Sequence, residues 1–252
     1  MINGNTALIA HIGYPTHTFK SPMIYNPYFE SAGINAVVVP MGCKPENYPP
    51  FLKAVFTLEN ICGALITMPH KVTTVGLLDD VTATVRVAGA CNAVKRLADG
   101  RLVGDMFDGA GFVRGVQRKG FDLTGKRVLV VGTGGVGCAI AASLAGAGIA
   151  AISLFDVNTA GCEALAQRLK TNYPQIDVRT GSNDPVDHDL VVNATPMGMN
   201  EGDPLPMDVS RLSPETFVGE VVMKAETTAF LAAAQARGCR TQVGTDMLYE
   251  QI

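Results

Sequence analysis

The fold of this chain is decided by residues 127–148, RVLVVGTGGVGCAIAASLAGAG. The first five residues predict a buried strand, and the alanine-rich residues after the glycines are typical of a buried helix. Between them the spacing is Gly-x-Gly-x-x-Gly, at Gly132, Gly134 and Gly137. The first glycine permits a tight turn, the second lets backbone approach a pyrophosphate, and the third allows close packing of helix on strand. The stretch therefore predicts a doubly wound α/β domain that binds a dinucleotide.

The strand after this glycine loop indicates which dinucleotide is bound. Residues 151–155, AISLF, end at Asp156, 24 positions after Gly132. An acidic residue at this place binds the ribose hydroxyls of NAD and repels the additional phosphate of NADP. Asn158 and Thr159 follow, without the arginine that would accept that phosphate. The sequence favours NAD over NADP; the structural alternative is an ordinary strand and turn in which Asp156 caps a helix.

Further cofactor contacts are expected where later strands end. The apolar run 190–192 leads into the small and polar residues 193–199, as a buried strand that ends beside a ligand would. A plain exit from strand to loop is the alternative for this segment. The predicted cofactor-binding residues are Gly132, Gly134, Gly135, Val136, Gly137, Asp156, Asn193, Thr195, Met199, Val222 and Gly244.

Strand-like and helix-like segments alternate along most of the chain, which predicts sheets covered by helices. In the first half, strands are expected over 7–12, 34–39 and 63–67, with a helix over 22–31. In the second half, strands are expected at 127–131, 151–155 and 190–193, with a final helix over 227–237. The fold class is therefore α/β.

A domain boundary is expected near residues 109–123, where a helix over 110–119 leads into a turn-like stretch. We expect a substrate-binding domain with a parallel or mixed sheet over residues 1–110. A Rossmann dinucleotide-binding domain is expected over 111–225, and residues 226–252 are expected to pack back on the first domain.

Composition excludes several classes of protein. Only 17% of the 252 residues are charged, the net charge is −3, and lysines and arginines do not cluster, so nucleic acid is not an expected partner. No apolar stretch is long enough to predict a membrane span, and no basic residue precedes Lys20, as a secretory signal would require. The expected location is the cytoplasm.

The six cysteines are scattered and form no Cys-x-x-Cys pair. Their spacing supports neither a metal site nor a disulfide framework, so no metal is expected. Free, buried thiols in a reducing compartment are the simplest interpretation.

Two ionisable residues of the first half follow strand-like runs, where the sites of α/β proteins gather. Lys71 comes soon after the run 63–67, and Asp108 lies in a glycine-rich turn after Gly104. Taken singly, Lys71 could be a surface lysine and Asp108 a helix cap. His70 is an alternative acid or base, although its neighbouring position places it on a different helix face.

The chain resembles the shikimate dehydrogenase family at five motifs that occur in the same order and span nearly its whole length. Residues 63–71, GALITMPHK, resemble G-x-N-V-T-x-P-x-K, and residues 89–93, GACNA, resemble G-A-x-N-T. Residues 106–112, MFDGAGF, resemble N-T-D-G-x-G-F. Residues 19–26, FKSPMIYN, and 244–251, GTDMLYEQ, resemble S-x-S-P-x-x-H-N and G-x-x-M-L-x-x-Q.

This resemblance implies an alcohol dehydrogenase that transfers a hydride reversibly between a nicotinamide and a ring hydroxyl of shikimate, quinate or a similar cyclic hydroxy acid. It implies Lys71 and Asp108 as the catalytic pair. Oxidising an alcohol releases a proton as well as a hydride, so the lysine would take the proton and the aspartate would orient the lysine. The implied substrate-binding residues are Ser21, Thr67, Asn92 and Gln251. The expected partner is this small molecule, and the chain is expected to be a monomer or a homodimer.

Departures from the family's motifs gather at the substrate end. Apolar residues replace polar ones at Phe19, Leu65, Ala93, Met106, Phe107 and Met223. Because an unpaired buried polar group costs about 1–3 kcal/mol, losing hydrogen-bonding partners weakens recognition of a polar acid. The leading hypothesis is therefore a paralogue with altered substrate preference. A biosynthetic, NADP-dependent shikimate 5-dehydrogenase and a non-catalytic NAD-binding sensor are the alternatives.

Overall fold

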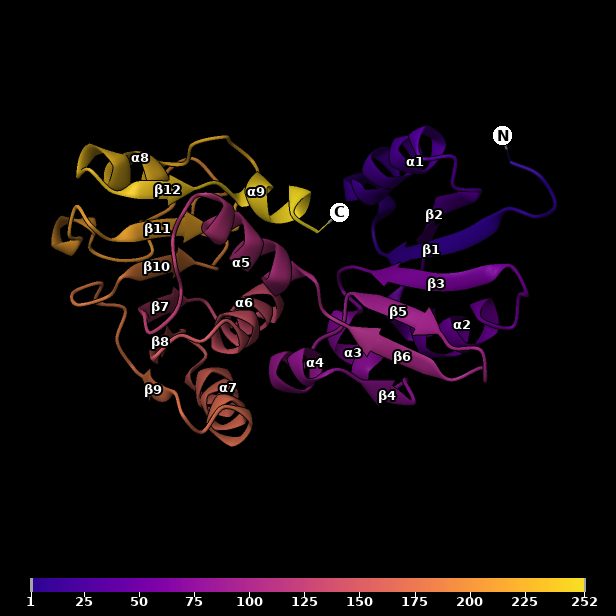
Figure 1. Cartoon of the computed structure of the whole chain (residues 1–252), viewed down its shortest axis with the longest axis horizontal. Coiled ribbons are helices and arrows are strands. Elements are labelled where there is room, and N and C mark those ends of the chain that lie inside the picture. The colour runs from indigo at the N-terminus through magenta and orange to yellow at the C-terminus, as the bar shows by residue number, and fades with distance from the viewer. Residues whose placement is uncertain (1, 252) are drawn as a thin grey trace. The chain divides into compact units, whose positions relative to one another are not determined.

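The computed structural model describes residues 2–251 and divides the chain into two compact units, Met1–Met106 and Phe107–Ile252 (Figure 1). Residues 1 and 252, at the outer ends of the expected domains, lie outside the described range. Each unit is built around its own sheet, and each is treated below by itself.

The first unit contains a mixed six-stranded sheet in the order β2-β1-β3-β5-β6-β4. Its strands are β1 (Ala7–Gly13), β2 (Ala36–Gly42), β3 (Ile61–Ile66), β4 (Asp80–Val81), β5 (Ala93–Arg96) and β6 (Leu102–Asp105). Its helices are α1 (Ser21–Ser31), α2 (Tyr48–Val55), α3 (Lys71–Val75) and α4 (Ala83–Ala88), with short 3₁₀ turns at Thr16–Thr18 and Pro45–Asn47. β1 runs parallel to β2 and β3, whereas β5 is antiparallel to both of its neighbours.

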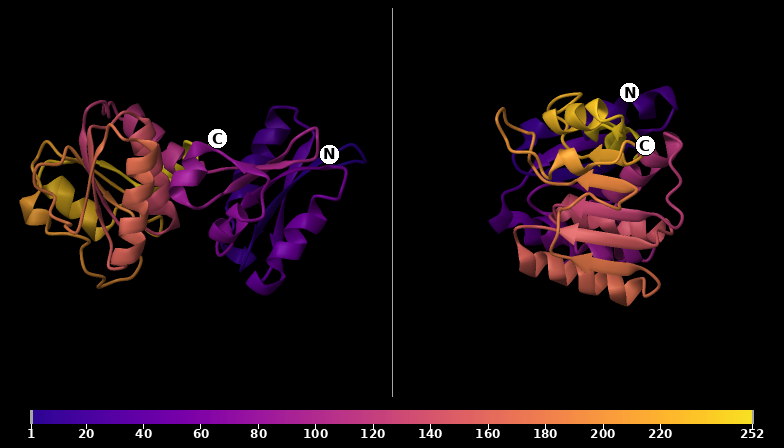
Figure 2. Two further views of the ribbon diagram at one scale, coloured as in Figure 1. Left: turned by 90° about the horizontal axis from the view of Figure 1, so that it is seen from below. Right: turned by 90° about the vertical axis from the view of Figure 1, so that its left-hand side faces the viewer.

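The second unit contains a fully parallel six-stranded sheet in the order β12-β11-β10-β7-β8-β9. Its strands are β7 (Arg127–Val131), β8 (Ala151–Phe155), β9 (Asp177–Thr180), β10 (Leu190–Asn193), β11 (Phe217–Glu220) and β12 (Arg240–Gln242). Its helices are α5 (Asp108–Arg118), α6 (Gly135–Gly146), α7 (Thr159–Asn172), α8 (Ala229–Ala236) and α9 (Gly244–Tyr249), with a 3₁₀ turn at Val209–Arg211. Figure 2 shows helices on both faces of this sheet.

The central strands of the second unit are buried along almost their whole length because helices or loops cover both faces of the sheet. Every residue of β10 and β11 is buried, and β7 is buried after Arg127. The direction of winding reverses at β7, which has β8 on one side and β10 on the other. In open α/β sheets such a reversal point, at the carboxyl ends of the strands, is where ligands bind.

The structure differs from the sequence expectations mainly at the end of the chain. Residues 226–252 are expected to pack back on the first domain, whereas in the structure β12 adds to the sheet of the second unit by pairing with β11, and α9 packs against α5. The unit boundary falls after Met106 rather than after residue 110, because the first turn of α5 belongs to the second unit.

Within residues 2–251, no helix combines the length and apolar character needed to cross a bilayer. The same part of the chain holds no group of three or more His, Cys, Asp or Glu side chains that could bind a metal ion. All six cysteines are free thiols; five are buried as expected, and Cys62 is exposed.

Candidate active site

The glycine loop lies in the second unit, between the carboxyl ends of β8 and β10. The N–H of Gly132 donates to the Phe155 carbonyl at 2.8 Å, and the N–H of Ala194 donates to the Val131 carbonyl at 2.7 Å. Gly132 has φ +99°, and a Cβ there would lie 2.7 Å from the carbonyl carbon of Ala194. Only glycine fits this turn, because a side chain would meet both an unfavourable backbone angle and the neighbouring backbone.

Gly137 closes the loop against its first glycine. A Cβ on Gly137 would overlap the carbonyl oxygen of Gly132. By contrast, Gly134 and Gly135 are exposed, and an added Cβ would meet nothing within 4 Å at either position. The loop therefore has two glycines required by packing and two that leave open space in front of the first turn of α6. The N–H groups of that turn have no partner inside the helix, and together with the helix dipole they favour an anion.

A pocket of about 450 Å³ opens beside this loop within the second unit. Its walls come from the ends of β7, β8 and β10 and from a proline-rich loop. The lining residues are Val131, Gly132, Gly134, Phe155, Asp156, Val157, Asn183, Ala194, Thr195, Pro196, Met197, Pro204, Leu205 and Pro206. The lining is mainly apolar and contains one carboxylate and no lysine or arginine, which suits a flat, uncharged ring with polar groups at its edge.

Asp156 lies at the rim of this pocket, directly after β8. One of its carboxylate oxygens accepts hydrogen bonds from the N–H and, at 3.1 Å, from the hydroxyl of Thr133, and the other accepts from the N–H of Asn158 at 2.8 Å. Burial would raise the pKa of the Asp156 carboxyl, but these hydrogen bonds outweigh it and hold the pKa below its usual range. The side chain is therefore ionised at neutral pH and held in one orientation.

The residues predicted after β10 form a compact turn. The buried Asn193 accepts hydrogen bonds from the N–H and the hydroxyl of Thr195, at 3.1 and 2.6 Å, and donates to the carbonyl of Met197 at 3.1 Å. Asn193 therefore shapes the turn from beneath, whereas Thr195 lines the pocket and Met199 is exposed.

Val222 and Gly244, the last two predicted cofactor-binding residues, are in contact with each other. Val222 lies in the segment after β11, and Gly244, the first residue of α9, packs directly against its backbone carbonyl. Both are buried.

Glu220, the last residue of β11, is a buried acid that the sequence did not single out. It is fully buried, and within residues 2–251 neither carboxyl oxygen has a partner at hydrogen-bonding geometry. Burial raises the pKa of Glu220 above its usual value, although the nearby side chains of Thr228 and Asn193 oppose part of the rise. The carboxyl group is therefore held toward its protonated, neutral form.

This carboxyl group is expected to make stability depend on pH. Below the ordinary glutamate pKa the acid is protonated in both folded and unfolded states, so it carries no penalty. As pH rises through that value only the unfolded chain loses the proton, which favours unfolding until the folded pKa is passed. Glu220→Gln should therefore stabilise the second unit by about 1 kcal/mol at pH 8 and leave it unchanged at pH 4. Thermal unfolding at both pH values measures this, and an equal shift at both would contradict it.

In the first unit, three of the predicted residues lie together where β3 ends and β5 begins. Thr67 follows β3, and its N–H donates to the Ile12 carbonyl of β1 at 2.9 Å. Lys71 begins α3, and its carbonyl accepts from the N–H of Cys91 at 2.9 Å. Asn92 follows Cys91 and precedes β5. Backbone hydrogen bonds thus bring Lys71 and Asn92 next to the end of β3, although they are far apart in sequence.

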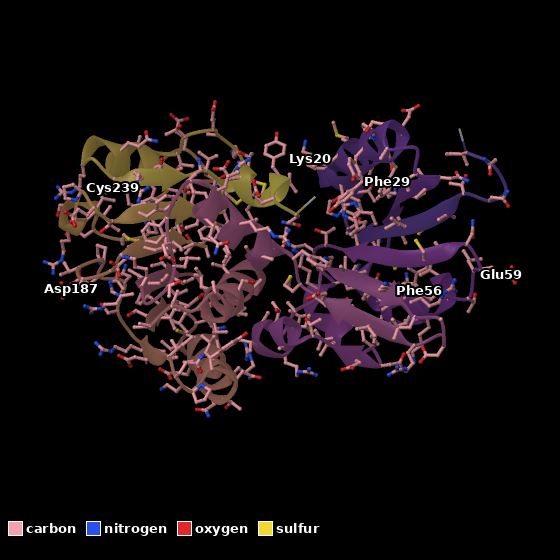
Figure 3. The ribbon with its side chains drawn as sticks, in the orientation of Figure 1. Lys20, Phe29, Phe56, Glu59, Asp187 and Cys239 are labelled. Atoms are coloured by element: carbon pink, nitrogen blue, oxygen red, sulfur yellow. The ribbon has the colours of Figure 1, made fainter. Side chains whose placement is uncertain are left out.

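Ser21 is the first residue of α1 and is half-buried. Figure 3 labels Lys20, the residue directly before Ser21, at one end of this unit. It labels Glu59, which precedes β3, at the other end. Ser21 therefore lies toward the end where β1 and β3 finish.

His70 has a structural role in the first unit. Its ring stacks on Tyr48 with centroids 3.9 Å apart and an interplanar angle of 6°, and its Nε2 lies 2.8 Å from the Cys43 carbonyl oxygen. Only 1% of the residue is exposed. A buried ring that is stacked and has one nitrogen engaged in this way is poorly placed to exchange a proton with a ligand.

Asp108 and Gln251 belong to the second unit and lie together there. Asp108 is the first residue of α5 and is buried. Nε2 of Gln251 donates to Asp108 Oδ1 at 3.5 Å and to the Met247 carbonyl at 3.3 Å. The structure thus groups the predicted residues into two sets, with Ser21, Thr67, Lys71 and Asn92 in the first unit and Asp108 and Gln251 in the second.

The residues that replace polar positions of the family differ in burial. Met106 is 1% exposed and belongs to the core, whereas Phe107 and Met223 are 40% and 41% exposed. Phe19 and Leu65 are half-buried and lie in the first unit. The proline-rich loop 204–206, which lines the pocket, was missed by the sequence analysis because no local motif marks it.

Comparison with known proteins agrees with this architecture. Residues 11–94 match the family described as the shikimate dehydrogenase substrate binding domain. The shikimate dehydrogenase (NADP(+)) of Desulforamulus reducens is 33% identical over 259 residues, which cover 99% of this chain and 88% of that protein.

Two solved structures have the same fold over nearly the whole chain. The shikimate 5-dehydrogenase of Listeria monocytogenes, in complex with shikimate and NAD, gives a TM-score of 0.92 at 28% identity, covering 99% of this chain and 90% of that one. The quinate dehydrogenase of Corynebacterium glutamicum, in complex with NAD, gives 0.87 at 30% identity, covering 98% and 90%. Sequence identity above 30% along almost the full length, on a shared fold, means that the chain belongs to the shikimate dehydrogenase family of NAD(P)-dependent oxidoreductases.

Proposed function

We propose that this protein transfers a hydride reversibly between NAD and a ring hydroxyl or ketone of a cyclic hydroxy acid, with shikimate and quinate as the first candidates. The observation that carries this proposal is the cluster of Thr67, Lys71 and Asn92 at the strand ends of the first unit, in a chain of this family. The cluster offers a proton-carrying amine, an amide and a hydroxyl to one small polar ligand.

The proton would be handled by Lys71 and Asp108. When bound, the nicotinamide supplies a hydride acceptor or donor. Lys71 takes the hydroxyl proton as the alcohol is oxidised and returns it in the reverse direction. Asp108, whose Oδ1 accepts from Gln251, orients the ammonium group and shares its proton. Ser21, Thr67, Asn92 and Gln251 would bind the remaining polar groups of the substrate.

The cofactor would lie along the glycine loop of the second unit. Gly134, Gly135, Val136 and Gly137 would present N–H groups to the pyrophosphate, and the mainly apolar pocket would take the adenine. Asn193, Thr195, Met199, Val222 and Gly244 would border the nicotinamide half.

NAD is proposed as the cofactor rather than NADP. The ionised carboxylate of Asp156 stands at the pocket where the adenine ribose would lie, and no lysine or arginine lines that pocket. A carboxylate pairs with the ribose hydroxyls of NAD and repels a phosphate. NADP remains the second candidate because the Desulforamulus relative carries NADP(+) in its name, whereas the Listeria and Corynebacterium structures hold NAD.

Asp156→Asn is expected to relax this preference. An asparagine keeps an oxygen that can accept from Thr133, but it removes the charge that repels a phosphate. The ratio of kcat/KM for NADP to that for NAD should rise about 10-fold or more, which corresponds to about 1.4 kcal/mol. Asp177→Asn, an exposed aspartate at the start of β9, is the matched control and should leave the ratio unchanged. A wild-type protein that prefers NADP would overturn the assignment.

Initial rates test the function as a whole. Purified protein is offered shikimate and quinate, each with NAD and with NADP. Turnover of either acid with NAD supports the proposal, and turnover with NADP alone supports the second candidate. NAD binding without turnover of either acid would reject both acids as substrates and favour a non-catalytic sensor or another hydroxy acid.

A further inference from the structure

His11, in β1 of the first unit, is a buried histidine with an unsatisfied ring nitrogen. It lies two residues before the end of β1, opposite Leu65 of β3, and is 5% exposed. Among the described residues, nothing forms a hydrogen bond with its Nδ1. An orphaned polar atom of this kind costs about 1–3 kcal/mol, so it usually has a water, an ion or a ligand as its partner.

Phe19 and Thr67 share the face of the sheet that His11 occupies. The ring centroids of His11 and Phe19 are 4.1 Å apart, with an interplanar angle of 31°. Gly13, two residues further along β1, points to the same side. A Cβ on Gly13 would lie 2.9 Å from Cζ of Phe19 and would touch the methyl group of Thr67. His11 therefore lies among side chains at the strand ends where the substrate-binding residues gather.

The protonation of His11 depends on its burial and on the charge of Lys71. Burial lowers the pKa of His11 to about 4, and the positive charge of Lys71 contributes to the same shift. At neutral pH the imidazole is therefore uncharged, with one protonated nitrogen and one lone pair. An uncharged imidazole can donate to or accept from a hydroxyl group, which itself both donates and accepts.

We propose that His11 is a substrate-binding and specificity-determining residue whose Nδ1 exchanges a hydrogen bond with a ring hydroxyl of the substrate, while Phe19 packs against the apolar edge of the same ring. This inference rests on the proposed function, because it requires Lys71 to face the reacting carbon. The substrate class is a polyhydroxylated ring with a hydroxyl adjacent to the one that is oxidised. An analogue without that hydroxyl would leave Nδ1 unpaired, which is how the residue discriminates.

The test compares two substrates in wild-type protein and in His11→Leu. One is whichever of shikimate and quinate the wild type oxidises, and the other is its analogue without the adjacent ring hydroxyl. For the full substrate, His11→Leu should lower kcat/KM about 10-fold or more, mainly through KM, because one hydrogen bond to a hydroxyl is lost. For the deoxy analogue, the two proteins should differ by less than about threefold, because there is no bond left to lose.

Three further variants separate substrate binding from structure. His188→Leu is the matched control: His188 also has an unpartnered Nδ1, but it lies in the second unit with its Nε2 2.9 Å from Ser153 Oγ. It should leave kcat/KM unchanged. His11→Asn should recover part of the activity and His11→Gln should not, because asparagine places an amide near the position of Nδ1 and glutamine near that of Nε2. The comparison of His11→Asn with His11→Gln also tests the inference if His11→Leu fails to fold.

The outcomes distinguish this inference from the proposed function. No turnover of either acid by wild-type protein rejects the proposed function. Normal turnover by wild-type protein, with equal kcat/KM for His11→Leu on the full substrate, rejects only the role of His11. Equal losses for both substrates in His11→Leu would mean that His11 supports the fold of the site or holds a water, and would also overturn the inference.

Discussion

Lys71→Ala is expected to lower kcat by about 10²–10⁴-fold, the range that general acid–base catalysis contributes. Alanine cannot carry the proton that leaves the hydroxyl during oxidation. The affinity for NAD should stay unchanged, because the glycine loop and Asp156 belong to the second unit, whereas Lys71 belongs to the first. Steady-state rates with the preferred acid, together with NAD binding measured by calorimetry or fluorescence, check both parts.

The control for this experiment is Lys53→Ala, since Lys53 is an exposed lysine of α2 in the same unit. It should retain wild-type rates, so that a loss in Lys71→Ala cannot be ascribed to removing any lysine. Turnover of Lys71→Ala within about 10-fold of wild type, a change of about 1.4 kcal/mol in the barrier, would show that another group moves the proton.

Gly137→Ala is expected to disrupt the glycine loop and abolish NAD binding. The added methyl group would overlap the carbonyl oxygen of Gly132, which the fold holds in place between β8 and β10. Relief requires a shift of backbone, so the cost should reach the upper end of that for overpacking, about 3 kcal/mol. For a unit of this size the unfolding temperature should fall by roughly 6–12 °C.

The other glycines of the loop provide a graded comparison. Gly135→Ala and Gly134→Ala add a methyl group to open space, so neither should lower the unfolding temperature. Gly134→Ala should nevertheless weaken NAD binding, because this glycine lets the backbone approach the pyrophosphate. If Gly137→Ala is as stable as Gly135→Ala, the close contact with Gly132 does not constrain the loop. Calorimetric unfolding of the three variants, with and without NAD, measures each effect.

The parts of the fold that could be predicted are those whose signal is contiguous in sequence. The strand expected at 127–131 is β7, and the strand expected at 151–155 is β8. The helix expected after the glycines begins within them, at Gly135. Glycine has a low helix propensity, so the sequence places the start too late, whereas the close approach of Gly137 to Gly132 and Ala194 fixes the first turn.

The parts that could not be predicted depend on distant partners. β5 (AVKR), β6 (LVGD) and β12 (RTQ) are short and show little alternation of polar and apolar residues. They form because neighbouring strands supply hydrogen bonds for their backbone, as β11 does for β12. For residues 226–252 the sequence predicts only a helix over 227–237 and no strand at β12, because strand pairing is not a local property of sequence.

The candidate site divides in the same way. Sequence alone determined the glycine loop, the acid at the end of β8 and the identity of the Lys71 and Asp108 candidates, because each is carried by a short motif. Only the tertiary structure decided that Thr133 holds Asp156, that Tyr48 and Cys43 engage His70, and that Phe19 lies on His11. These contacts join separate turns and strands of the chain. Their geometry and burial arise only when the sheets form and neighbouring strands bring those segments together.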